Sequence, residues 1–190
     1  MRVGICGGTF DPFHRGHLDP ILSVRGEMQW DRILYVPAFV QPFKQDRQTA
    51  SGPHRFAMAV LATEAYDDMF VDPRELERGA VSYTVDTLRE LRNEYADDTL
   101  DWIIGDDNLE KLHEWKSIET ILELANFVVL TRLGSRSSSI PVRFVENPTV
   151  PVSSTEIRRR ARAGEPIDDL VGARVSRYIH HYGLYRKGQT

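Results

Sequence analysis

The stretch GGTFDPFHRGH, residues 7–17, lies between an apolar run at residues 3–6 and a segment with helical spacing. Its paired glycines, Gly7 and Gly8, allow close backbone approach and positive φ angles. The helix that follows would present free N–H groups and the positive end of its dipole, which suit a phosphate. Open parallel sheets bind their ligands at this place, beyond the carboxyl end of a strand. We therefore expect a strand, a phosphate-binding turn and a helix.

The same alternation of strands and helices continues along the chain. Short apolar runs predict strands at residues 3–6, 33–36, 69–71, 100–104, 127–130 and 142–145. Apolar residues at helical spacing predict helices at residues 18–28, 53–65, 84–95, from 109 onward, 118–124, 155–163 and 168–182. This pattern is typical of a parallel sheet that is covered on both faces. The sequence therefore predicts an α/β fold with a Rossmann-like parallel sheet, and polar loops at residues 41–52 and 135–139.

Composition excludes several classes of protein. The chain has 190 residues, with 24 Lys+Arg against 28 Asp+Glu, and its formal net charge of −4 argues against a chain-wide grip on nucleic acid. The single cysteine, Cys6, excludes a disulfide framework, and we expect it to be a buried small hydrophobe. No apolar run approaches the roughly 18 residues of a membrane span, and the opening run is too short for a signal peptide. We therefore expect one cytoplasmic domain.

Two histidines in the first stretch are candidate catalytic residues. His14 and His17 are three positions apart, and a helix that begins near Gly16 would aim both imidazoles at one phosphate. Their expected role is to donate hydrogen bonds to charge that develops on a transferring phosphoryl group. A surface histidine pair in a glycine-rich turn is an alternative. A metal site with Asp11 or Asp19 as added ligands is another, although the turn after a first strand suits phosphate better than a tetrahedral cage.

A second anion site is predicted at VSSTEIRRR, residues 152–160. Its serines and threonine can cap a helix, and their hydroxyl and N–H groups can receive an anion. Arg158 is three residues after Thr155 and four after Ser154, so its guanidinium can reach the same anion with two hydrogen bonds. The alternative is an ordinary capped helix with a solvated basic face, and the neighbouring arginines are interpreted as surface residues: Arg159, Arg160 and Arg162.

These two motifs together resemble those of the nucleotidylyltransferase superfamily, which carries an H-x-G-H motif early and an SST-x-IR motif late. Within it the chain is similar to the bacterial nicotinate-nucleotide adenylyltransferases nearly from end to end. The matching stretches are GGTFDP at 7–12, YTVDTL at 83–88, IGDDNL at 104–109 followed by Trp115, RLG at 132–134, and YIHHYGLY at 178–185. One departure lies at residues 41–44, where the family usually has PPHK and this chain has QPFK, with Phe43 in place of the histidine.

The resemblance implies a nucleotidylyltransferase fold in a single domain over residues 1–190, with a helical C-terminal part from about residue 153. It implies adenylyl transfer from ATP to nicotinate mononucleotide, giving deamido-NAD and pyrophosphate without a covalent enzyme intermediate. His14 and His17 would hold the α-phosphate. Lys44 and Arg158 would neutralise the β- and γ-phosphates, and Mg²⁺ would arrive with ATP and need few or no protein ligands.

The resemblance also implies how the rest of the two substrates is held. The remaining ATP-binding residues would be Gly7, Gly8, Thr9, Phe10, Gly105, Asp107, Arg132, Ser154 and Thr155. For the pyridine end, we expect Thr84 to cap a helix whose N-terminus meets the nicotinate carboxylate. Trp115 would stack on the pyridine ring, and the alternative is that it is a half-buried packing aromatic.

Other functions remain open from the sequence. A pantetheine-phosphate adenylyltransferase would be shorter and would have no counterpart of residues 83–88. A nicotinamide mononucleotide enzyme differs only in the pyridine substituent. A non-catalytic nucleotide sensor would keep the glycines but would not need both histidines, Lys44 and Arg158. The sequence leaves open whether the chain forms a homo-oligomer.

Overall fold

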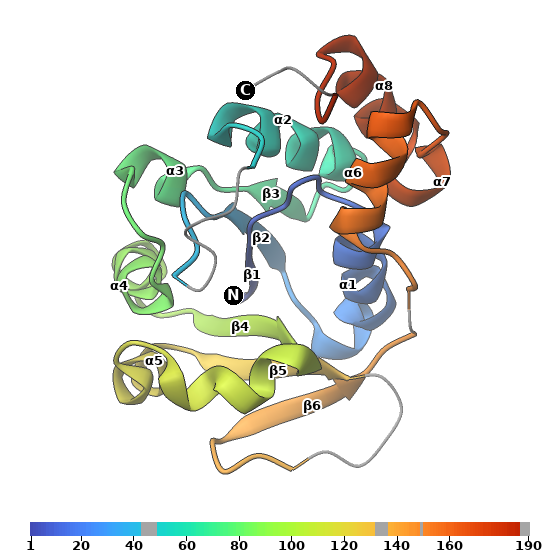
Figure 1. Cartoon of the computed structure of the whole chain (residues 1–190). Coiled ribbons are helices and arrows are strands. Elements are labelled where there is room, and N and C mark those ends of the chain that lie inside the picture. The colour runs from blue at the N-terminus through green and yellow to red at the C-terminus, as the bar shows by residue number, and fades with distance from the viewer. Residues whose placement is uncertain (43–48, 132–136, 149, 187–190) are drawn as a thin grey trace.

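The computed structural model describes residues 1–42, 49–131, 137–148 and 150–186, and these form a six-stranded sheet with helices around it (Figure 1). The strands are β1 (Arg2–Gly8), β2 (Arg32–Pro37), β3 (Met69–Val71), β4 (Thr99–Gly105), β5 (Asn126–Thr131) and β6 (Val142–Glu146). Their order is β3-β2-β1-β4-β5-β6, and neighbouring strands pair in parallel. The chain therefore winds one way from β1 and the other way from β4, which puts a ligand crevice at the carboxyl ends of these two strands.

The helices lie between the strands and after the last one. They are α1 (Arg15–Met28), α2 (Gly52–Thr63), α3 (Arg74–Arg78), α4 (Thr84–Glu94), the 3₁₀ helix η1 (Asp106–Glu114), α5 (Ile118–Leu124), α6 (Ser154–Ala163), α7 (Asp168–Val171) and α8 (Ala173–His181). Within the described part of the chain, none of them is long and apolar enough to cross a membrane.

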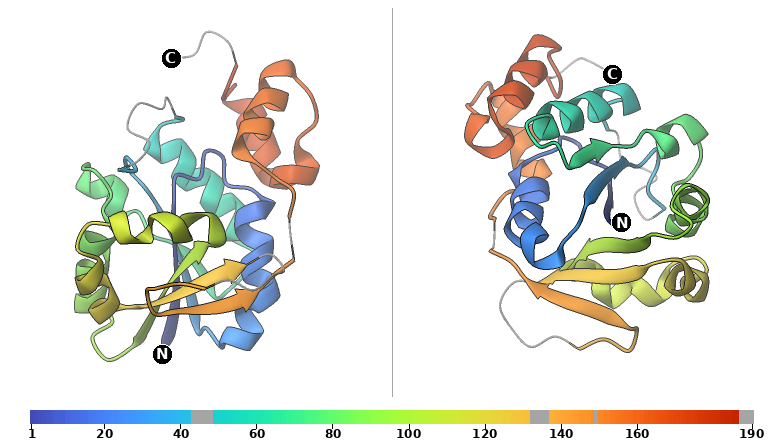
Figure 2. Two further views of the ribbon diagram at one scale, coloured as in Figure 1. Left: turned by 60° about the horizontal axis from the view of Figure 1, so that its bottom comes forward. Right: turned by 180° about the vertical axis from the view of Figure 1, so that it is seen from behind.

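Side chains of each strand alternate between two cores, as the strand period of two requires. In β2, Ile33 and Tyr35 belong to the core that contains Ile21 of α1. Leu34 belongs to the core on the other face, with Leu88 of α4. The views in Figure 2 agree, with α1 and α2 on one side of the sheet and α4 and α5 on the other. The prediction of a parallel sheet covered on both faces is confirmed.

The C-terminal helices pack on the face that carries α1 and α2. Ile157 of α6 and Ile179 of α8 are buried in the same core as Met58 of α2, and Figure 1 shows α6, α7 and α8 grouped beside α1 and α2. Cys6 is buried in this core as expected. The late motif on α6 is thereby brought to the carboxyl end of β1.

The structure corrects two element predictions and adds one helix. The helix expected at residues 168–182 is two helices, because Gly172 between them has φ +82°, which a continuing helix does not allow. The helix expected from residue 109 onward is the 3₁₀ helix η1 and begins at Asp106. The five-residue helix α3 was not predicted, since one turn and a half is too short to show a period.

Candidate functional site

The turn after β1 is shaped by aromatic rings that pack on its glycines. A Cβ atom on Gly7 would lie 2.7 Å from the Trp102 ring, and one on Gly8 would lie 2.7 Å from the Phe10 ring. The left-handed backbone in this turn is at Phe10, with φ +51°. The prediction that the two glycines supply positive φ is therefore wrong for this described segment. They are needed because only a residue without a side chain leaves room for the rings.

The two histidines lie face to face at the start of α1, which begins one residue before Gly16. Their ring centroids are 3.7 Å apart and the ring planes differ by 24°. The His14 main-chain N–H donates to His17 Nδ1 at 3.2 Å. A Cβ atom on Gly16 would lie 2.9 Å from the His14 ring, so the glycine between the histidines is required by packing. The two imidazoles therefore lie together, as the spacing indicated, and their aim at one phosphate stays a prediction.

His14 is a neutral imidazole at pH 7. Its residue is 6% exposed. Burial, with a smaller contribution from the nearby Arg158 charge, lowers the pKa of His14 to about 4. A neutral ring donates one hydrogen bond and accepts another, so it can meet an anion without bringing a full charge into the interior. Within the residues that the structure describes, no group of three or more His, Cys, Asp or Glu side chains is placed to hold a metal ion.

The late motif contacts the first motif, although the two residues that meet are 140 positions apart in the sequence. His14 Nε2 lies 3.1 Å from the Ser154 hydroxyl. Arg158 donates from Nη1 to the Asp11 carbonyl oxygen at 2.6 Å and from Nη2 to the Thr155 hydroxyl at 3.3 Å. The two motifs that are predicted to bind anions are therefore in direct contact, at the start of α1 and the start of α6.

The hydroxyls of the late motif divide their roles. Ser153 is the N-cap of α6, and its Oγ accepts from the Glu156 N–H at 3.3 Å. Ser154 and Thr155 are the first two helical residues. Of the three hydroxyl residues that the sequence offered as caps, the cap is therefore Ser153. The Ser154 and Thr155 hydroxyls are left on the side of His14 and Arg158.

Arg159 points away from this site, as predicted. Its guanidinium pairs with Glu156 at 2.8 Å and with Glu165 at 2.9 Å on the exposed side of α6. Arg158, the preceding residue, is the arginine that turns toward the first motif.

Asp11 joins the first turn to two distant segments, and sequence reasoning did not identify this role. Its carboxylate oxygen Oδ1 accepts from the Tyr185 hydroxyl at 2.7 Å and from the Ala50 N–H at 3.1 Å. The Arg158 guanidinium lies 3.8 Å from Oδ2. Burial, together with the charge and hydrogen bond of Asp11, raises the pKa of Tyr185, so the phenol stays protonated and donates. The matching stretch at 178–185 contained this tyrosine but gave no sign of its partner.

Arg55 was also missed, and it holds together the loops that follow β1 and β2. It is only 2% exposed. Its guanidinium donates to the carbonyl oxygens of Thr9 at 2.8 Å, Ala38 at 2.7 Å and Ala50 at 2.9 Å. In the sequence it is one basic residue in a helix and resembles a surface arginine. Only its burial distinguishes it.

The end of β4 supplies the next part of the site. Gly105 is the last residue of β4 and precedes η1. A Cβ atom there would lie 2.7 Å from Asp107 Oδ1, so the glycine lets the Asp107 side chain fold back over the strand end. Asp107 is exposed and accepts from Asn108 at 3.0 Å. Two predicted site residues, Lys44 and Arg132, lie outside the described residues, as does Phe43.

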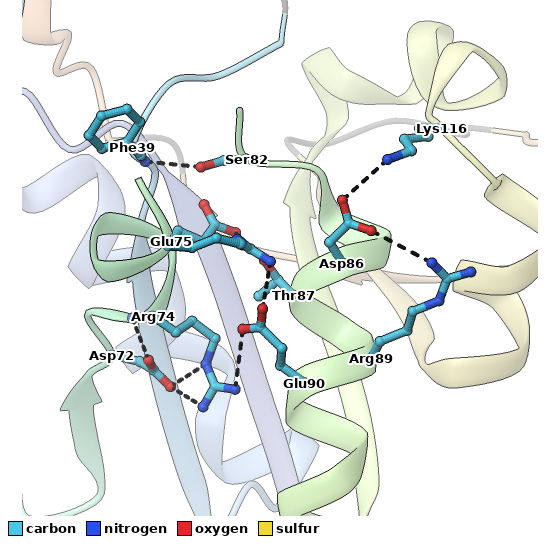
Figure 3. A network of polar contacts seen from close by, with 11 residues as sticks. Phe39, Asp72, Arg74, Glu75, Ser82, Asp86, Thr87, Arg89, Glu90 and Lys116 are labelled. Carbon is cyan, nitrogen blue, oxygen red and sulfur yellow. Dashed lines mark hydrogen bonds and ion pairs between the residues drawn. The ribbon is translucent and has the colours of Figure 1, made fainter. Parts of the chain in front are cut away.

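Lys116, two residues after the end of η1, lies beside the start of α4 (Figure 3). Lys116 Nζ pairs with Asp86 at 3.2 Å and lies 4.3 Å above the centre of the Tyr83 ring. Tyr83 occupies the N-cap position and Thr84 is the first helical residue, so the prediction that Thr84 caps the helix is wrong. The Thr84 side chain is half-buried at the N-terminus of α4.

Trp115, the residue before Lys116, packs against the core under α4. Its ring meets Phe127 edge-on with centroids 5.8 Å apart, and the residue is half-buried against the core under α4. The packing role considered from the sequence is therefore present. The stacking of Trp115 on a pyridine ring stays a prediction.

Comparisons with known proteins agree with this geometry. The family model described as cytidylyltransferase-like matches residues 5–160. A protein of Thermoanaerobacter sp. (strain X514) with the name probable nicotinate-nucleotide adenylyltransferase is 36% identical over 203 residues, covering 100% of this chain and 96% of that protein. A protein of Tropheryma whipplei (strain Twist) with the same name is 40% identical over 184 residues, covering 95% of this chain and 97% of that protein.

Solved structures of low sequence identity share the fold. Plasmodium falciparum nicotinic acid mononucleotide adenylyltransferase complexed with APC has a TM-score of 0.78 at 17% identity, covering 97% of this chain and 96% of that one. The same protein complexed with NaAD has a TM-score of 0.77 at 18% identity, covering 97% of both chains.

Proposed function

The chain belongs to the cytidylyltransferase-like family and, within it, to the nicotinate-nucleotide adenylyltransferases, and from this membership we propose that it transfers the adenylyl group of ATP to nicotinate mononucleotide. The products are deamido-NAD and pyrophosphate. The observation that carries the proposal is the joining of the two anion motifs, with His14 Nε2 at 3.1 Å from the Ser154 hydroxyl. A triphosphate needs several such contacts in one place.

The reaction is a single displacement at phosphorus. An oxygen of the mononucleotide phosphate forms a bond to the α-phosphorus of ATP, and the bond from that phosphorus to the bridging oxygen breaks, so that pyrophosphate leaves. The attacking phosphate is already ionised and needs no general base. Catalysis is then positioning and charge stabilisation.

His17 is the donor best placed for the α-phosphate. Its Nδ1 accepts the His14 N–H, so in the neutral ring the proton is on Nε2, which donates. His14 lies on the same phosphate region with its ring stacked on that of His17. A donor fixed in this way stabilises charge in the transition state without reorganisation.

Arg158 and Lys44 bind the β- and γ-phosphates, together with the Ser154 and Thr155 hydroxyls. Arg158 already holds the Asp11 carbonyl oxygen and the Thr155 hydroxyl, which orients its fork before ATP binds. Mg²⁺ enters with ATP as part of the substrate, bound to the triphosphate.

The nucleoside parts of the two substrates are bound by residues at the ends of β1 and β4 and at the start of α4. The turn at residues 7–10, together with Gly105, Asp107 and Arg132, holds the adenosine of ATP. At the pyridine end, the N-terminus of α4 beside Thr84 meets the nicotinate carboxylate, and Trp115 lies against the ring. An N-terminal helix end favours a negative group over a neutral one.

We also propose that residues 1–190 form one domain, because α6 and α8 share a core with α1 and α2. The prediction of a cytoplasmic protein stays a prediction, and so does the absence of a nucleic-acid partner.

The test is a pyrophosphate-release assay with ATP, Mg²⁺ and either mononucleotide. We expect release with nicotinate mononucleotide and a preference of about 10²-fold in kcat/KM over the nicotinamide form. The helix N-terminus favours the carboxylate, and a neutral amide leaves donors unpaired. Equal use of both would overturn the nicotinate assignment and leave adenylyl transfer intact, and a preference for the nicotinamide form would favour that alternative. ATP binding without turnover by folded protein would favour a sensor and overturn the proposal.

A further inference from the structure

A single buried guanidinium joins the segments that follow β1 and β2. Arg55 of α2 is 2% exposed, and its Nη1 donates to the carbonyl oxygens of Thr9 at 2.8 Å and Ala38 at 2.7 Å. Its Nη2 donates to the Phe39 carbonyl oxygen at 3.4 Å, and its Nε donates to the Ala50 carbonyl oxygen at 2.9 Å. Each of the three guanidinium nitrogens therefore has an acceptor, as a cation in the interior requires.

On one side, this network holds the turn that the proposed function gives to ATP. Thr9 follows Gly8, whose carbonyl oxygen accepts from the Ala38 N–H at 2.8 Å. Two residues after Thr9, the Asp11 carboxylate accepts from the Ala50 N–H at 3.1 Å. The turn is therefore held to both places by further hydrogen bonds beside those of the guanidinium.

On the other side, the segment after Ala38 contacts the segment that precedes α4. The Phe39 main-chain N–H donates to the Ser82 hydroxyl at 2.9 Å, as Figure 3 shows. The Ser82 N–H donates to the Val40 carbonyl oxygen at 2.8 Å, and Val40 pairs with Val81 as an isolated parallel bridge. The residues after Ser82 begin α4, and the proposed function gives that helix end to the pyridine carboxylate.

We propose that Arg55 is a positioning residue for adenylyl transfer, which holds the ATP-binding turn and the mononucleotide subsite at a fixed separation. The inference rests on the proposed function. The attacking phosphate oxygen must meet the α-phosphorus at about 3–3.5 Å and in line with the leaving oxygen, so a small shift of one subsite against the other slows the chemical step. Each subsite keeps its own contacts during such a shift, so the binding of each substrate changes little.

The variant Arg55→Lys separates the charge of this side chain from its geometry. Arginine presents its donors in a planar fork, whereas the ammonium of lysine is a compact charge on a flexible stem. One nitrogen then takes the place of three, so it cannot keep the positions of the bonds that Nε, Nη1 and Nη2 make. The substitution therefore keeps the positive charge and loosens the connection between the segments.

Arg92 offers a matched control at the amino ends of the strands. Its Nη1 donates to the carbonyl oxygens of Tyr95 at 3.0 Å and Asp98 at 2.8 Å, and its Nη2 donates to that of Leu124. It therefore joins the segments that precede β4 and β5 by the same kind of bond, whereas the proposed site is at the carboxyl ends of the strands. Arg92→Lys should lower stability, as Arg55→Lys does, and leave turnover unchanged.

The experiment compares Arg55→Lys and Ser82→Ala with the control Arg92→Lys. Pyrophosphate release is measured in a single turnover, with enzyme in excess over nicotinate mononucleotide and ATP saturating, and in steady state with each substrate varied in turn. We expect Arg55→Lys to slow the single turnover about 10²-fold and Ser82→Ala about tenfold, with both KM values within about threefold of wild type. Arg92→Lys should leave the rate and both KM values within about twofold.

Thermal unfolding of each variant identifies loss of folding. If Arg55→Lys does not fold, Ser82→Ala carries the test, because it removes one connection between the segments without changing a charge. Its expected effect is the smaller one because the contacts of Val40 with Val81 and with the Ser82 N–H remain.

The outcomes separate this inference from the proposed function. An unchanged single-turnover rate in folded Arg55→Lys, a rise above about threefold in either KM, or an equal loss of rate in Arg92→Lys overturns the positioning role, while wild-type turnover upholds the proposed function. An unchanged rate in Ser82→Ala overturns the connection to the mononucleotide subsite, and with it the positioning role. A wild type that releases no pyrophosphate overturns both proposals.

Discussion

His14 is a residue whose charge is suppressed by its surroundings, where its ring stacks on His17 and contacts Ser154. Burial lowers its pKa from 6.5 to about 4. The unfolded chain therefore takes up a proton as the pH falls below about 6.5, whereas the native chain does not until about pH 4. Native stability contributed by the neutral ring is lost across this window as the pH falls.

The first prediction follows from this linkage. Between pH 7 and pH 4, His14→Gln should lose less free energy of unfolding than wild type, by up to about 3 kcal/mol. The measurement is urea unfolding of both proteins at several pH values. The other histidines are common to both, so they cancel in the comparison. Parallel decline of the two curves would show that His14 titrates normally.

His17 is the residue for the second prediction. His17→Ala should lower kcat by about 10²–10³-fold, the loss typical of one fixed donor to a developing oxyanion. The KM for ATP should change much less, because the contact strengthens in the transition state. His113→Ala is the control, since that exposed side chain lies near Glu114 and makes none of the contacts that join His14, His17 and Ser154. A kcat near that of wild type in a folded variant would remove His17 from the mechanism.

At the scale of elements, α6 carries two adjacent arginines with opposite surroundings. Arg158 contacts the first motif, and Arg159 pairs with Glu156 and Glu165 in solvent. The third prediction is that Arg158→Ala lowers kcat/KM for ATP by about 10²-fold or more, because a charge-assisted contact to phosphate is lost. Arg159→Ala should stay within about threefold, as exposed ion pairs contribute little. Steady-state kinetics of both variants is the measurement, and equal losses would mean that the helix acts through diffuse charge.

Strands and long helices were predictable from the sequence because their signals are local. The apolar runs at residues 33–36 and 127–130 are buried strands, as expected. The break at Gly172 was not predictable, since a glycine is tolerated inside many helices and only the surrounding packing determines its φ angle. The Thr84 error has the same origin, because a cap one residue earlier differs in backbone angles and not in pattern.

At the scale of the whole molecule, the sheet has a polar lock at the end opposite the site. Asp101 of β4 is fully buried and accepts from Arg2 at 2.6 Å, Trp30 at 2.8 Å and Asn126 at 3.0 Å. These partners join β1, β4, β5 and the segment before β2. The lock therefore contributes to stability, and its contacts among the described residues do not include the strand ends that are proposed to bind ligand.

The fourth prediction separates stability from activity. Asp101→Ala should lower the free energy of unfolding by about 3 kcal/mol or more, because it leaves buried donors and the Arg2 charge without their acceptor. Where the variant is folded, its kcat/KM should be within about twofold of wild type. Asp169→Ala, on the exposed start of α7, should change stability by about 0.5 kcal/mol at most. Unchanged stability in the Asp101 variant would contradict the lock.

The residues of the candidate site that belong to the two sequence motifs were predictable. His14, His17, Ser154 and Arg158 are brought together as the two motifs indicated. Arg55 was not predictable, because it acts through burial between elements that are distant in sequence. Its side chain has no period or spacing that distinguishes it from surface charges. What determines its role is the packing of α2 against the sheet.

Protein synthesis reaches Asp11 before Tyr185, and at about 5–20 residues per second the 174 positions between them take roughly 10–35 s. During that time the growing chain already contains the histidine pair, but the phenol that holds the Asp11 carboxylate has not been made. A chain that ends after α6 would contain both motifs and the Ala50 and Arg158 contacts of Asp11, but not the hydroxyl of Tyr185. The last contact of the Asp11 carboxylate therefore forms only when translation has passed residue 185.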